Sequence, residues 1–504
     1  MELFLQALQG VFLSPSVIGV IFIGVVFGIL FGCIPGLTAT LAIIMFLPLT
    51  YFMPPLSAIS MLVALYIGGI SGGLVAAVLL NIPGTPASIA TCFDGYPMAQ
   101  KGEAKKALGT GIIFSCFGTL FGLFFLVIFS PLLAKIAIKF GPYEYCALTL
   151  LSLLLSVALA GKDMLKGLIS AVLGAIFATV GLSPIDSVKR FTFGNYNLMT
   201  GFKLLVLLIG LFAVTEIFGY AQKGEEAENE NKNADCRIKG FGLSGREFVK
   251  QLPNAIRSAL IGLGIGILPG IGGSVSSLMS YTASRKMSKH PEEYGTGITD
   301  GVVASETANN ATIGGAIIPL LSLGIPGDAT TAVLLGGLMI AGVAPGPLIF
   351  EKNAATVYGV FVAMALAALI TLGIELFGIR IFVKMLSIPK YILFPVILVL
   401  CCIGAIGESN RIFDCWGILI FGIIGFLMIK NGFPTVPVIM GFILGPILEK
   451  NVRDVSMIYR AESLTRHPIA IFFGCATVLL LVLKVWTRFH DKNGKTGETS
   501  GNER

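Results

Sequence analysis

Long apolar runs recur along the whole chain and constrain its fold more than any other feature. They cover residues 17–34, 56–80, 107–133, 145–160, 164–183, 203–219, 311–325, 354–377, 391–406, 412–429 and 468–486. A membrane-spanning helix needs about 20 apolar residues, and a backbone can cross lipid only if it satisfies its own hydrogen bonds. The runs lack the alternation of a membrane barrel strand. The sequence therefore predicts an all-α polytopic membrane protein in a lipid bilayer.

The composition argues against several other classes of protein. Only 12% of the residues are charged, against about 25% in soluble domains. The net charge of +7 is spread over loops and ends, without the basic, aromatic-interleaved face that binds nucleic acid. Glu2 stands where a signal peptide has its basic region, so no cleavable signal is expected. The nine cysteines lack metal-ligand spacing. We expect them to be small buried hydrophobes, and we expect no cofactor.

One long polar stretch, residues 222–250, divides the chain near its middle, and the two sides repeat one plan. We predict a first transmembrane repeat at 1–221, a polar connecting loop at 222–250, a second repeat at 251–466, an added C-terminal helix at 467–487 and a polar tail at 488–504. Lys and Arg gather in the loop and the tail, which indicates that both are cytoplasmic. If each repeat holds an odd number of spans, the two repeats are inverted relative to each other.

Pro-Gly pairs interrupt the apolar segments at four places, two in each half. The first half reads GILFGCIPGLTATLA and later AAVLLNIPGTPASIA; the second reads GLGIGILPGIGGSVSS and later PLLSLGIPGDATTAV. A proline kink without a ligand explains a single such pair. Interrupted segments in corresponding positions of two halves are instead typical of the binding site of a secondary transporter. We therefore expect broken or re-entrant helices that meet at the membrane midplane.

Hydroxyl and small residues follow each of these breaks. A helix that restarts there presents unpaired N–H groups and the positive end of its dipole, which suits a small oxyanion. No Lys or Arg lies near the breaks, so amide groups, helix dipoles and a co-transported cation would have to neutralise such a guest. The candidate substrate-binding residues are Pro35, Gly36, Thr38, Thr40, Pro83, Gly84, Thr85, Ser88, Pro269, Gly270, Gly272, Ser274, Pro326, Gly327 and Thr330.

Ionisable side chains in the apolar runs need a reason, because each costs at least about 2.5 kcal/mol at the centre of a bilayer. An acidic residue followed by two asparagines at helical spacing, together with the acid beside the fourth break, predicts a site for the coupling ion. Its residues are Glu306, Asn309, Asn310 and Asp328. They can hold Na⁺ through oxygen ligands or a proton on a carboxyl group, and the sequence does not choose between them. Glu216 and Glu375 lie near helix ends and are interpreted as interfacial carboxylates.

The glycine spacing ahead of the first break has a packing interpretation. Gly24, Gly28 and Gly32 recur every four residues and therefore share one face of a helix. Such a face lets a neighbouring helix approach closely without binding anything.

Four stretches together resemble one family. GCIPGLTATLA, YIGGISGGLVAAVLLNIPGTPASIATCFDGYPMAQKGEAKKALG, ILPGIGG and DGVVASETANNATIGGAIIPLLSLGIPGDATTAVLLGGLMIAGVAPGP are similar to the large membrane subunit of the bacterial tripartite tricarboxylate transporters, the TctA family. Ser305 stands where that pattern has a proline before the acidic residue. The resemblance implies a secondary carrier of the bacterial inner membrane, coupled to a Na⁺ or H⁺ gradient. It also implies a small four-helix membrane subunit and a periplasmic solute-binding protein that delivers a carboxylate such as citrate.

Two other functions use similar features. GISG at residues 69–72 fits the pattern of rhomboid-like proteases with Ser71 as nucleophile, but that chemistry needs a general base, usually histidine. The three histidines, His290, His467 and His490, lie in polar loops or at the ends of runs, and no phosphate-binding loop occurs. We therefore interpret Ser71 as a packing residue and the chain as no enzyme. A channel would also use broken helices, but the duplicated breaks favour alternating access around one site.

Overall fold

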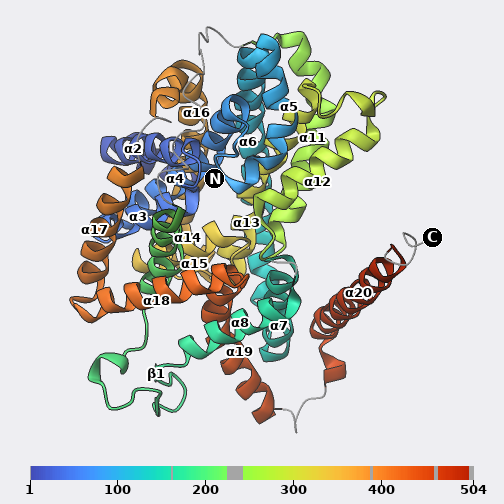
Figure 1. Ribbon diagram of the computed structural model, residues 1–504. Helices are drawn as coiled ribbons and strands as arrows, with labels where there is room; N and C mark the ends of the chain where they lie inside the picture. The colour runs from blue at the N-terminus through green and yellow to red at the C-terminus, as the bar shows by residue number, and fades with distance from the viewer. Residues whose placement is uncertain (1, 161–162, 224–241, 386–389, 459–463, 499–504) are drawn as a thin grey trace. The chain divides into compact units, whose positions relative to one another are not determined.

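The computed structural model describes residues 2–160, 163–223, 242–385, 390–458 and 464–498, and confirms the predicted all-α architecture (Figure 1). Up to residue 223 the α-helices are α1 (Glu2–Phe12), α2 (Pro15–Cys33), α3 (Ala39–Thr50), α4 (Pro55–Leu80), α5 (Ile89–Met98), α6 (Ala104–Ala137), α7 (Pro142–Ala160), α8 (Met164–Ala178), α9 (Leu204–Leu208) and α10 (Thr215–Lys223). From residue 245 they are α11 (Gly245–Ile267), α12 (Gly272–Met287), α13 (Thr299–Leu323), α14 (Ala329–Ile340), α15 (Ile349–Lys352), α16 (Ala354–Met385), α17 (Lys390–Ser409), α18 (Phe413–Lys430), α19 (Val436–Ile458) and α20 (Pro468–Glu498).

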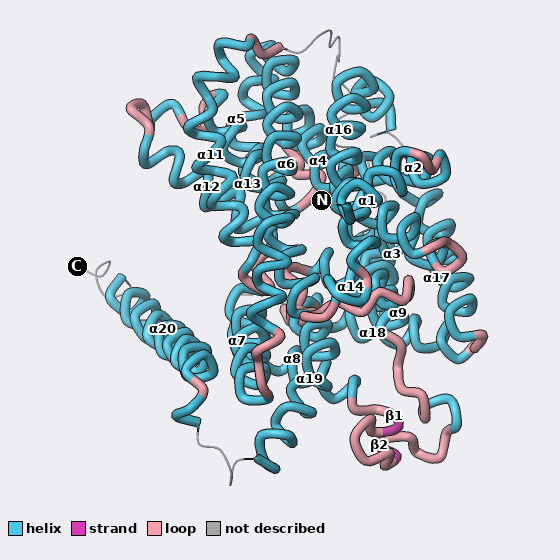
Figure 2. The backbone as a smooth tube through the Cα atoms, turned by 180° about the vertical axis from the view of Figure 1, so that it is seen from behind, coloured by secondary structure: helices cyan, strands magenta, loops and turns pink. Residues whose placement is uncertain are grey.

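Short elements complete the described chain. The 3-10 helices are η1 (Pro86–Ser88), η3 (Tyr196–Leu198), η6 (Pro291–Glu293) and η7 (Leu464–Arg466), and the π-helices are η2 (Ala99–Glu103) and η4 (Ile209–Val214). Strands β1 (Gly181–Leu182) and β2 (Lys189–Arg190) pair antiparallel, Gly181 opposite Arg190 (Figure 2).

Helices of membrane-spanning length account for about half of the predicted apolar runs. Within the described residues, six are long and apolar enough to cross a bilayer: Pro15–Cys33, Pro55–Leu80, Pro86–Ala137, Leu204–Gln222, Ala354–Gly378 and Phe413–Lys430. Three other predicted runs form the shorter apolar helices Pro142–Ala158, Met164–Ala178 and Pro468–Leu483. Ala39–Thr50 and Ala329–Ile340 are further short apolar helices outside the predicted runs. The chain is therefore a multi-pass membrane protein in which short helices are combined with full spans.

Two boundaries differ from the prediction. Helix α11 begins at Gly245, inside the stretch predicted as loop, because Ser244 and Glu247 form a capping box at its start. Helix α20 continues to Glu498, into the stretch predicted as polar tail. Residues 224–241, the middle of the predicted loop, lie outside the described residues.

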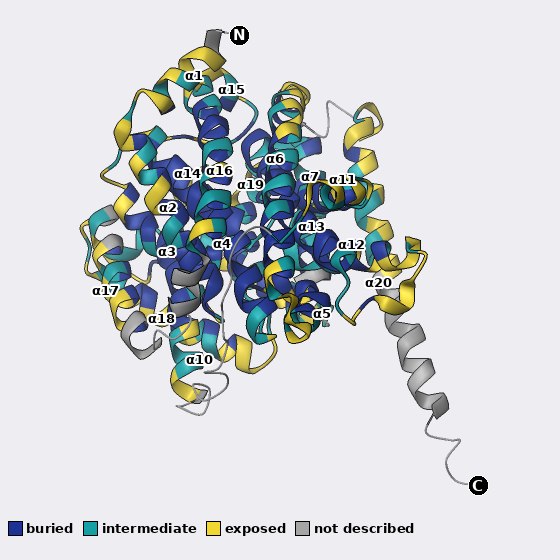
Figure 3. Ribbon diagram, turned by 90° about the horizontal axis from the view of Figure 1, so that it is seen from above, coloured by how far each residue is buried: buried dark blue, intermediate teal, exposed yellow. Residues whose placement is uncertain are grey.

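The chain forms two compact units, and each draws on both halves of the sequence. The first unit combines Met1–Ile138 with Phe202–Asn431, and the second combines Lys139–Gly201 with Gly432–Arg504. Most residues of α4 and α13, in the first unit, are buried (Figure 3). As part of the repeated plan, GPYEYCALTLLSLLLSVALAGKDML in the first half is similar to IPKYILFPVILVLCCIGAIGESNRI in the second. These stretches include α7 and α17, yet the two helices belong to different units. The two repeats with the predicted boundaries stay a prediction.

Helices α2 and α4 pack with almost no side chain between them, as the glycine spacing predicted. A Cβ atom on Gly24 would lie 2.8 Å from the Met61 carbonyl oxygen, and one on Gly28 would lie 2.6 Å from that of Leu65. Gly32 faces the Gly69 carbonyl in the same way. This close approach fixes the position of the first break, which directly follows α2.

We expect Gly28→Leu to destabilise the protein, because the added side chain must displace the backbone of α4. Overpacking of this kind costs about 1–3 kcal/mol, measured as a lower thermal unfolding temperature of the purified protein in detergent. Gly19→Leu is the matched control, since Gly19 lies in the same helix and its Cβ would meet nothing within 4 Å. Equal unfolding temperatures for the two variants would contradict the packing.

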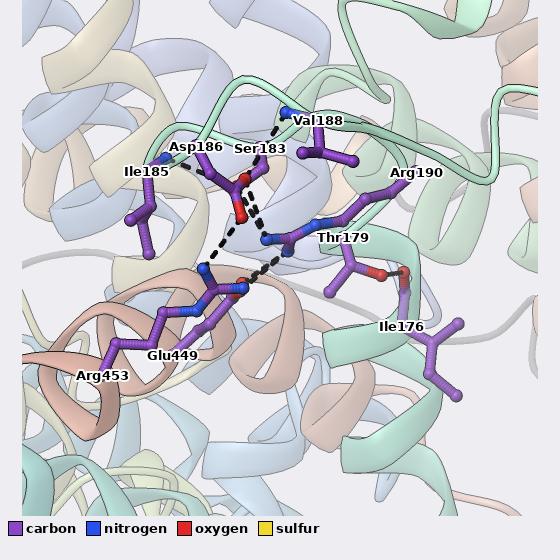
Figure 4. Close-up of polar contacts among 9 residues, drawn as sticks. All are labelled: Ile176, Thr179, Ser183, Ile185, Asp186, Val188, Arg190, Glu449 and Arg453. Atoms are coloured by element: carbon purple, nitrogen blue, oxygen red, sulfur yellow. Dashed lines mark hydrogen bonds and ion pairs between the residues drawn. The ribbon is translucent and has the colours of Figure 1, made fainter. Parts of the chain in front are cut away.

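In the second unit, ion pairs hold the β1–β2 loop against α19 (Figure 4). Arg190 bonds to Glu449 at 2.8 Å, and Arg453 bonds to Glu449 at 2.9 Å and to Asp186 at 3.1 Å. The Ser183 hydroxyl, followed by the Arg453 guanidinium, lowers the pKa of Asp186 to about 2. A depressed pKa means that the contact is intact above the ordinary pKa of aspartate and is lost as the pH falls toward 2. The loop therefore stays tethered throughout the physiological pH range.

Candidate functional site

Each of the four Pro-Gly pairs lies where one helix ends and another begins, so none is a kink in a continuous helix. The first separates α2 from α3, and the second separates α4 from η1 and α5. The third separates α11 from α12, and the fourth separates α13 from α14. The freed backbone groups at all four places must find partners outside their own helix.

Corresponding breaks in the two halves have the same backbone conformation. Gly36 and Gly270 lie in the left-handed region with φ of 87° and 84°, each two positions after an extended residue that caps the preceding helix. In the second and fourth breaks the helix itself ends on a left-handed residue, Asn81 with φ of 56° and Gly324 with φ of 73°. The local plan of the breaks is therefore repeated, and the inverted orientation of the two halves stays a prediction.

Hydrogen bonds join the breaks, all of which belong to the first unit. The Gly270 N–H of the third break donates to the Gly327 carbonyl oxygen of the fourth at 2.7 Å. The hydroxyl groups of Thr40 and Thr330, which follow the first and fourth breaks, share a hydrogen bond of 2.7 Å. Three breaks are thus connected directly.

The second break joins this group by packing. A Cβ atom on Gly273, after the third break, would lie 3.1 Å from the Cβ atom of Ala87 in η1. Four breaks that are far apart in the sequence therefore meet in one place. The residues that make these contacts, Thr40, Ala87, Gly270, Gly273, Gly327 and Thr330, are called the break junction below.

The candidate residues differ in how far the fold buries them. The buried candidates are Thr40, Gly84, Thr85, Ser88, Gly272, Pro326, Gly327 and Thr330. The half-buried candidates are Pro35, Thr38, Pro83, Pro269, Gly270 and Ser274, and Gly36 is exposed. Thr85 and Ser88 hydrogen-bond to each other at 3.1 Å and press against Gly73 of α4. Their hydroxyl groups therefore meet α4 instead of the other breaks.

The helices that restart after the breaks differ in how their N-termini are capped. The Thr38 side chain accepts from the Leu41 N–H at the start of α3. Asp328 caps α14 in a capping box with Thr331, and its second carboxylate oxygen accepts from the Tyr66 hydroxyl at 2.6 Å. Helix α12 has no side-chain cap. Of these three N-termini, α12 alone leaves its first N–H groups without a side-chain partner.

An unpaired amide lies beside this uncapped helix. Asn309 of α13 is 1% exposed, and neither its Oδ1 nor its Nδ2 atom has a hydrogen-bond partner among the described residues. A Cβ atom on Gly273 would lie 2.6 Å from Asn309 Oδ1. An unsatisfied buried polar group costs about 1–3 kcal/mol. Hydrogen-bonding groups that lack a partner among the described residues therefore lie beside the break junction.

Glu306 forms a separate, fully paired cluster on another side of α13. Thr91 donates to Oε1 at 2.5 Å, and Ser115 donates to Oε2 at 3.1 Å. The Asn310 amide donates to the Glu306 carbonyl oxygen at 3.0 Å and lies 3.4 Å from Oε2. Helix α13 continues unbroken through Ser305, where a proline was expected. Three side chains thus donate to one buried carboxylate, while Asn309 faces the break junction.

One interpretation of an acidic residue was wrong. Glu375 was predicted at an interface with water, but it is 1% exposed, and Ser71 donates to its Oε2 atom at 2.7 Å. Glu375 has apolar residues on both sides in the sequence, and this pattern indicated a buried acid. Its position near a predicted helix end indicated an interfacial carboxylate instead. Glu216 is exposed, as interpreted. Ser71 is buried and bonded to a carboxylate.

Asp94 is a second buried acid, and the sequence analysis missed it. It is 0% exposed, and its Oδ1 atom accepts the N–H groups of Gly295, Gly297 and Ile298 at 2.8–3.0 Å. Tyr281 of α12 donates to Oδ2 at 2.8 Å. Asp94 therefore ties α5, which follows the second break, to α12 and to the turn before α13.

With this geometry in hand, comparison with known proteins decides the family. The family model described as "Tripartite tricarboxylate transporter TctA family" matches residues 18–440. The chain belongs to the TctA family. The family comprises transporter components and not enzymes, and its tripartite name implies partner subunits.

Two curated proteins of Agrobacterium vitis are similar to this TctA family member. An uncharacterized 52.8 kDa protein in the TAR-I ttuC' 3' region is 38% identical over 476 residues, covering 94% of either chain. An uncharacterized protein in the TAR-II ttuC' 3' region is 36% identical over 224 residues, covering 44% of this chain and 93% of its own. None of the solved structures matches the chain.

Proposed function

We propose that this chain carries a di- or tricarboxylate, such as citrate, across the bacterial inner membrane, driven by a Na⁺ or H⁺ gradient. A periplasmic binding protein delivers the substrate, and a small four-helix membrane subunit completes the transporter. The two repeats lie inverted in the membrane and alternate around one central site.

The observation that carries this proposal is the unpaired Asn309 amide beside the uncapped start of α12. A carboxylate oxygen placed there accepts from the first α12 N–H groups and from Asn309 Nδ2, and the helix dipole favours its negative charge. The half-buried Ser274 adds a hydroxyl group in the same turn. Asp328 already caps the start of α14, and our proposal therefore assigns the bound anion to α12.

Movement between two access states follows from the contacts at the break junction. Thr40 and Thr330 bond directly to each other. A carboxylate substrate that reaches from α12 to the first and fourth breaks must replace that hydrogen bond with its own. We propose that the opening and closing of this contact accompanies transport, and that Glu306 with Asn310 holds the coupling cation nearby.

The test is uptake of labelled citrate into proteoliposomes that contain this chain with the membrane subunit and the binding protein. We expect saturable uptake that requires an imposed Na⁺ or pH gradient and the binding protein. Ser274→Phe and Thr38→Phe should abolish uptake while the protein still inserts, because both side chains would fill the space at the helix starts. Large ohmic currents through the purified subunit would indicate a channel instead, and normal uptake in both variants would reject the assigned site.

A further inference from the structure

A small polar cavity lies between α4, α6 and α16, away from the contacts that define the break junction. Its polar lining consists of Ser71, Ser115, Thr119, Thr371 and Glu375, together with the Cys116 thiol. The cavity measures about 10 Å³, which is room for the centre of one water-sized particle. All five oxygen-bearing side chains are at most 4% exposed. Ile67, Ile112, Ala368 and Leu372 complete the lining, and the cavity has room for a single small guest.

Two of its polar groups have no hydrogen-bond partner among the described residues. Glu375 accepts from Ser71 through Oε2, but its Oε1 atom has no hydrogen bond among the described residues. The hydroxyl group of Thr371, one helical turn earlier, is also unpaired. No lysine, arginine or histidine of the described residues forms an ion pair with Glu375. A buried carboxylate is stable only when a cation or a proton neutralises it.

We propose that Glu375 and Thr371 form a sodium site, completed by the hydroxyl oxygens of Ser71, Ser115 and Thr119. A proton on Oε1 would neutralise the carboxylate but would make no use of the hydroxyl oxygens around it. Ser71 donates its proton to Glu375 Oε2, Ser115 donates to Glu306 and Thr119 donates to the Ser115 carbonyl oxygen, so each hydroxyl oxygen keeps lone pairs available to a cation. One carboxylate with several neutral oxygen ligands balances a single positive charge and suits a hard ion.

The Glu375 site is distinct from the Glu306 cluster, although one residue links them. Both carboxylate oxygens of Glu306 accept hydroxyl donors, whereas Glu375 keeps one oxygen open. Ser115 lines the cavity and also donates to Glu306 Oε2 at 3.1 Å. A cation at Glu375 therefore reduces the repulsion between two buried carboxylates. The ion's part in coupling rests on the proposed transport function, but its binding does not.

The experiment measures sodium binding in the absence of any carboxylate, so that it is independent of transport. The thermal unfolding temperature of the purified chain in detergent is followed while NaCl replaces choline chloride at constant ionic strength. We expect a saturable rise in the wild type, because a ligand that binds only the folded state stabilises it. Glu375→Gln should reduce this rise and bind one radioactive sodium ion fewer per chain. Glu216→Gln, which alters an exposed carboxylate, should respond like the wild type.

A second pair of variants keeps the charge and changes only one ligand. Thr371→Val removes the hydroxyl oxygen and should raise the sodium concentration for half-maximal stabilisation about tenfold, the loss expected for one good polar contact to a charge. Thr371→Ser restores the oxygen and should restore the wild-type response. An unchanged sodium response in Glu375→Gln overturns the proposal. So does a wild-type protein that responds to pH but not to sodium, which would mark Glu375 as a proton site.

Discussion

Replacing Asn309 with aspartate should reduce carboxylate uptake by at least about 100-fold, a loss of roughly 2.7 kcal/mol in binding or transport. The substitution keeps the size of the side chain but removes the Nδ2 donor and adds a negative charge beside the uncapped start of α12. Like charges in a buried site repel by several kcal/mol. Uptake of labelled citrate, normalised to the amount of protein in the membrane, measures the effect.

Two controls separate this effect from a general loss of folding. Asn353→Asp places the same charge in the half-buried segment between α15 and α16, and should leave uptake unchanged. Gly273→Ala would bring a Cβ atom to 2.6 Å from Asn309 Oδ1 and should impair uptake, whereas Gly264→Ala meets nothing within 4 Å and should not. Wild-type uptake in Asn309→Asp would show that the carboxylate does not bind at the break junction.

Replacing Asp94 with alanine should destabilise the first unit by about 3–5 kcal/mol. The change removes the fully buried carboxylate that accepts three backbone N–H groups, those of Gly295, Gly297 and Ile298, and the Tyr281 hydroxyl. Each of these four hydrogen bonds contributes about 0.5–1.5 kcal/mol. We expect the thermal unfolding temperature in detergent to fall by about 5–10 °C.

A graded series tests whether hydrogen bonding causes this loss. Asp94→Asn keeps one oxygen for the backbone N–H groups and should show a smaller decrease, since only the contact with Tyr281 is rearranged. Asp186→Ala is the control, because Asp186 also accepts N–H and guanidinium donors but lies on the surface. This variant should change the unfolding temperature little. Equal effects of Asp94→Ala and Asp94→Asn would contradict the role assigned to the backbone N–H groups.

Local chemistry made the breaks predictable. A proline lacks the N–H group that a helix interior needs, and a following glycine adopts the left-handed conformation at no steric cost. Gly36 and Gly270 do adopt it. The close packing of Gly28 against α4 was predictable for the same kind of reason, because a row of glycines every four residues forms a flat helix face.

The roles of the polar residues were less predictable, because a helix presents neighbouring residues to different surroundings. Asn309 and Asn310 are adjacent in the sequence and were assigned to one ion site. One step along α13 turns them apart, so that Asn310 contacts Glu306 while Asn309 faces Gly273. Asp328 was assigned to the same site, but its carboxylate caps α14. Only the partners supplied by other helices distinguish these cases.

The sequence by itself determined the class of this protein. It is an all-α membrane protein of the TctA family, with helices interrupted at four Pro-Gly pairs. These features depend on composition and on residues that are neighbours in the chain. The tertiary structure decided which breaks touch, that Asn309 is left unpaired beside α12, and that Glu375 is buried against Ser71. Those properties depend on contacts between residues hundreds of positions apart. Whether a buried polar group is satisfied depends on which partners the fold brings within hydrogen-bond distance.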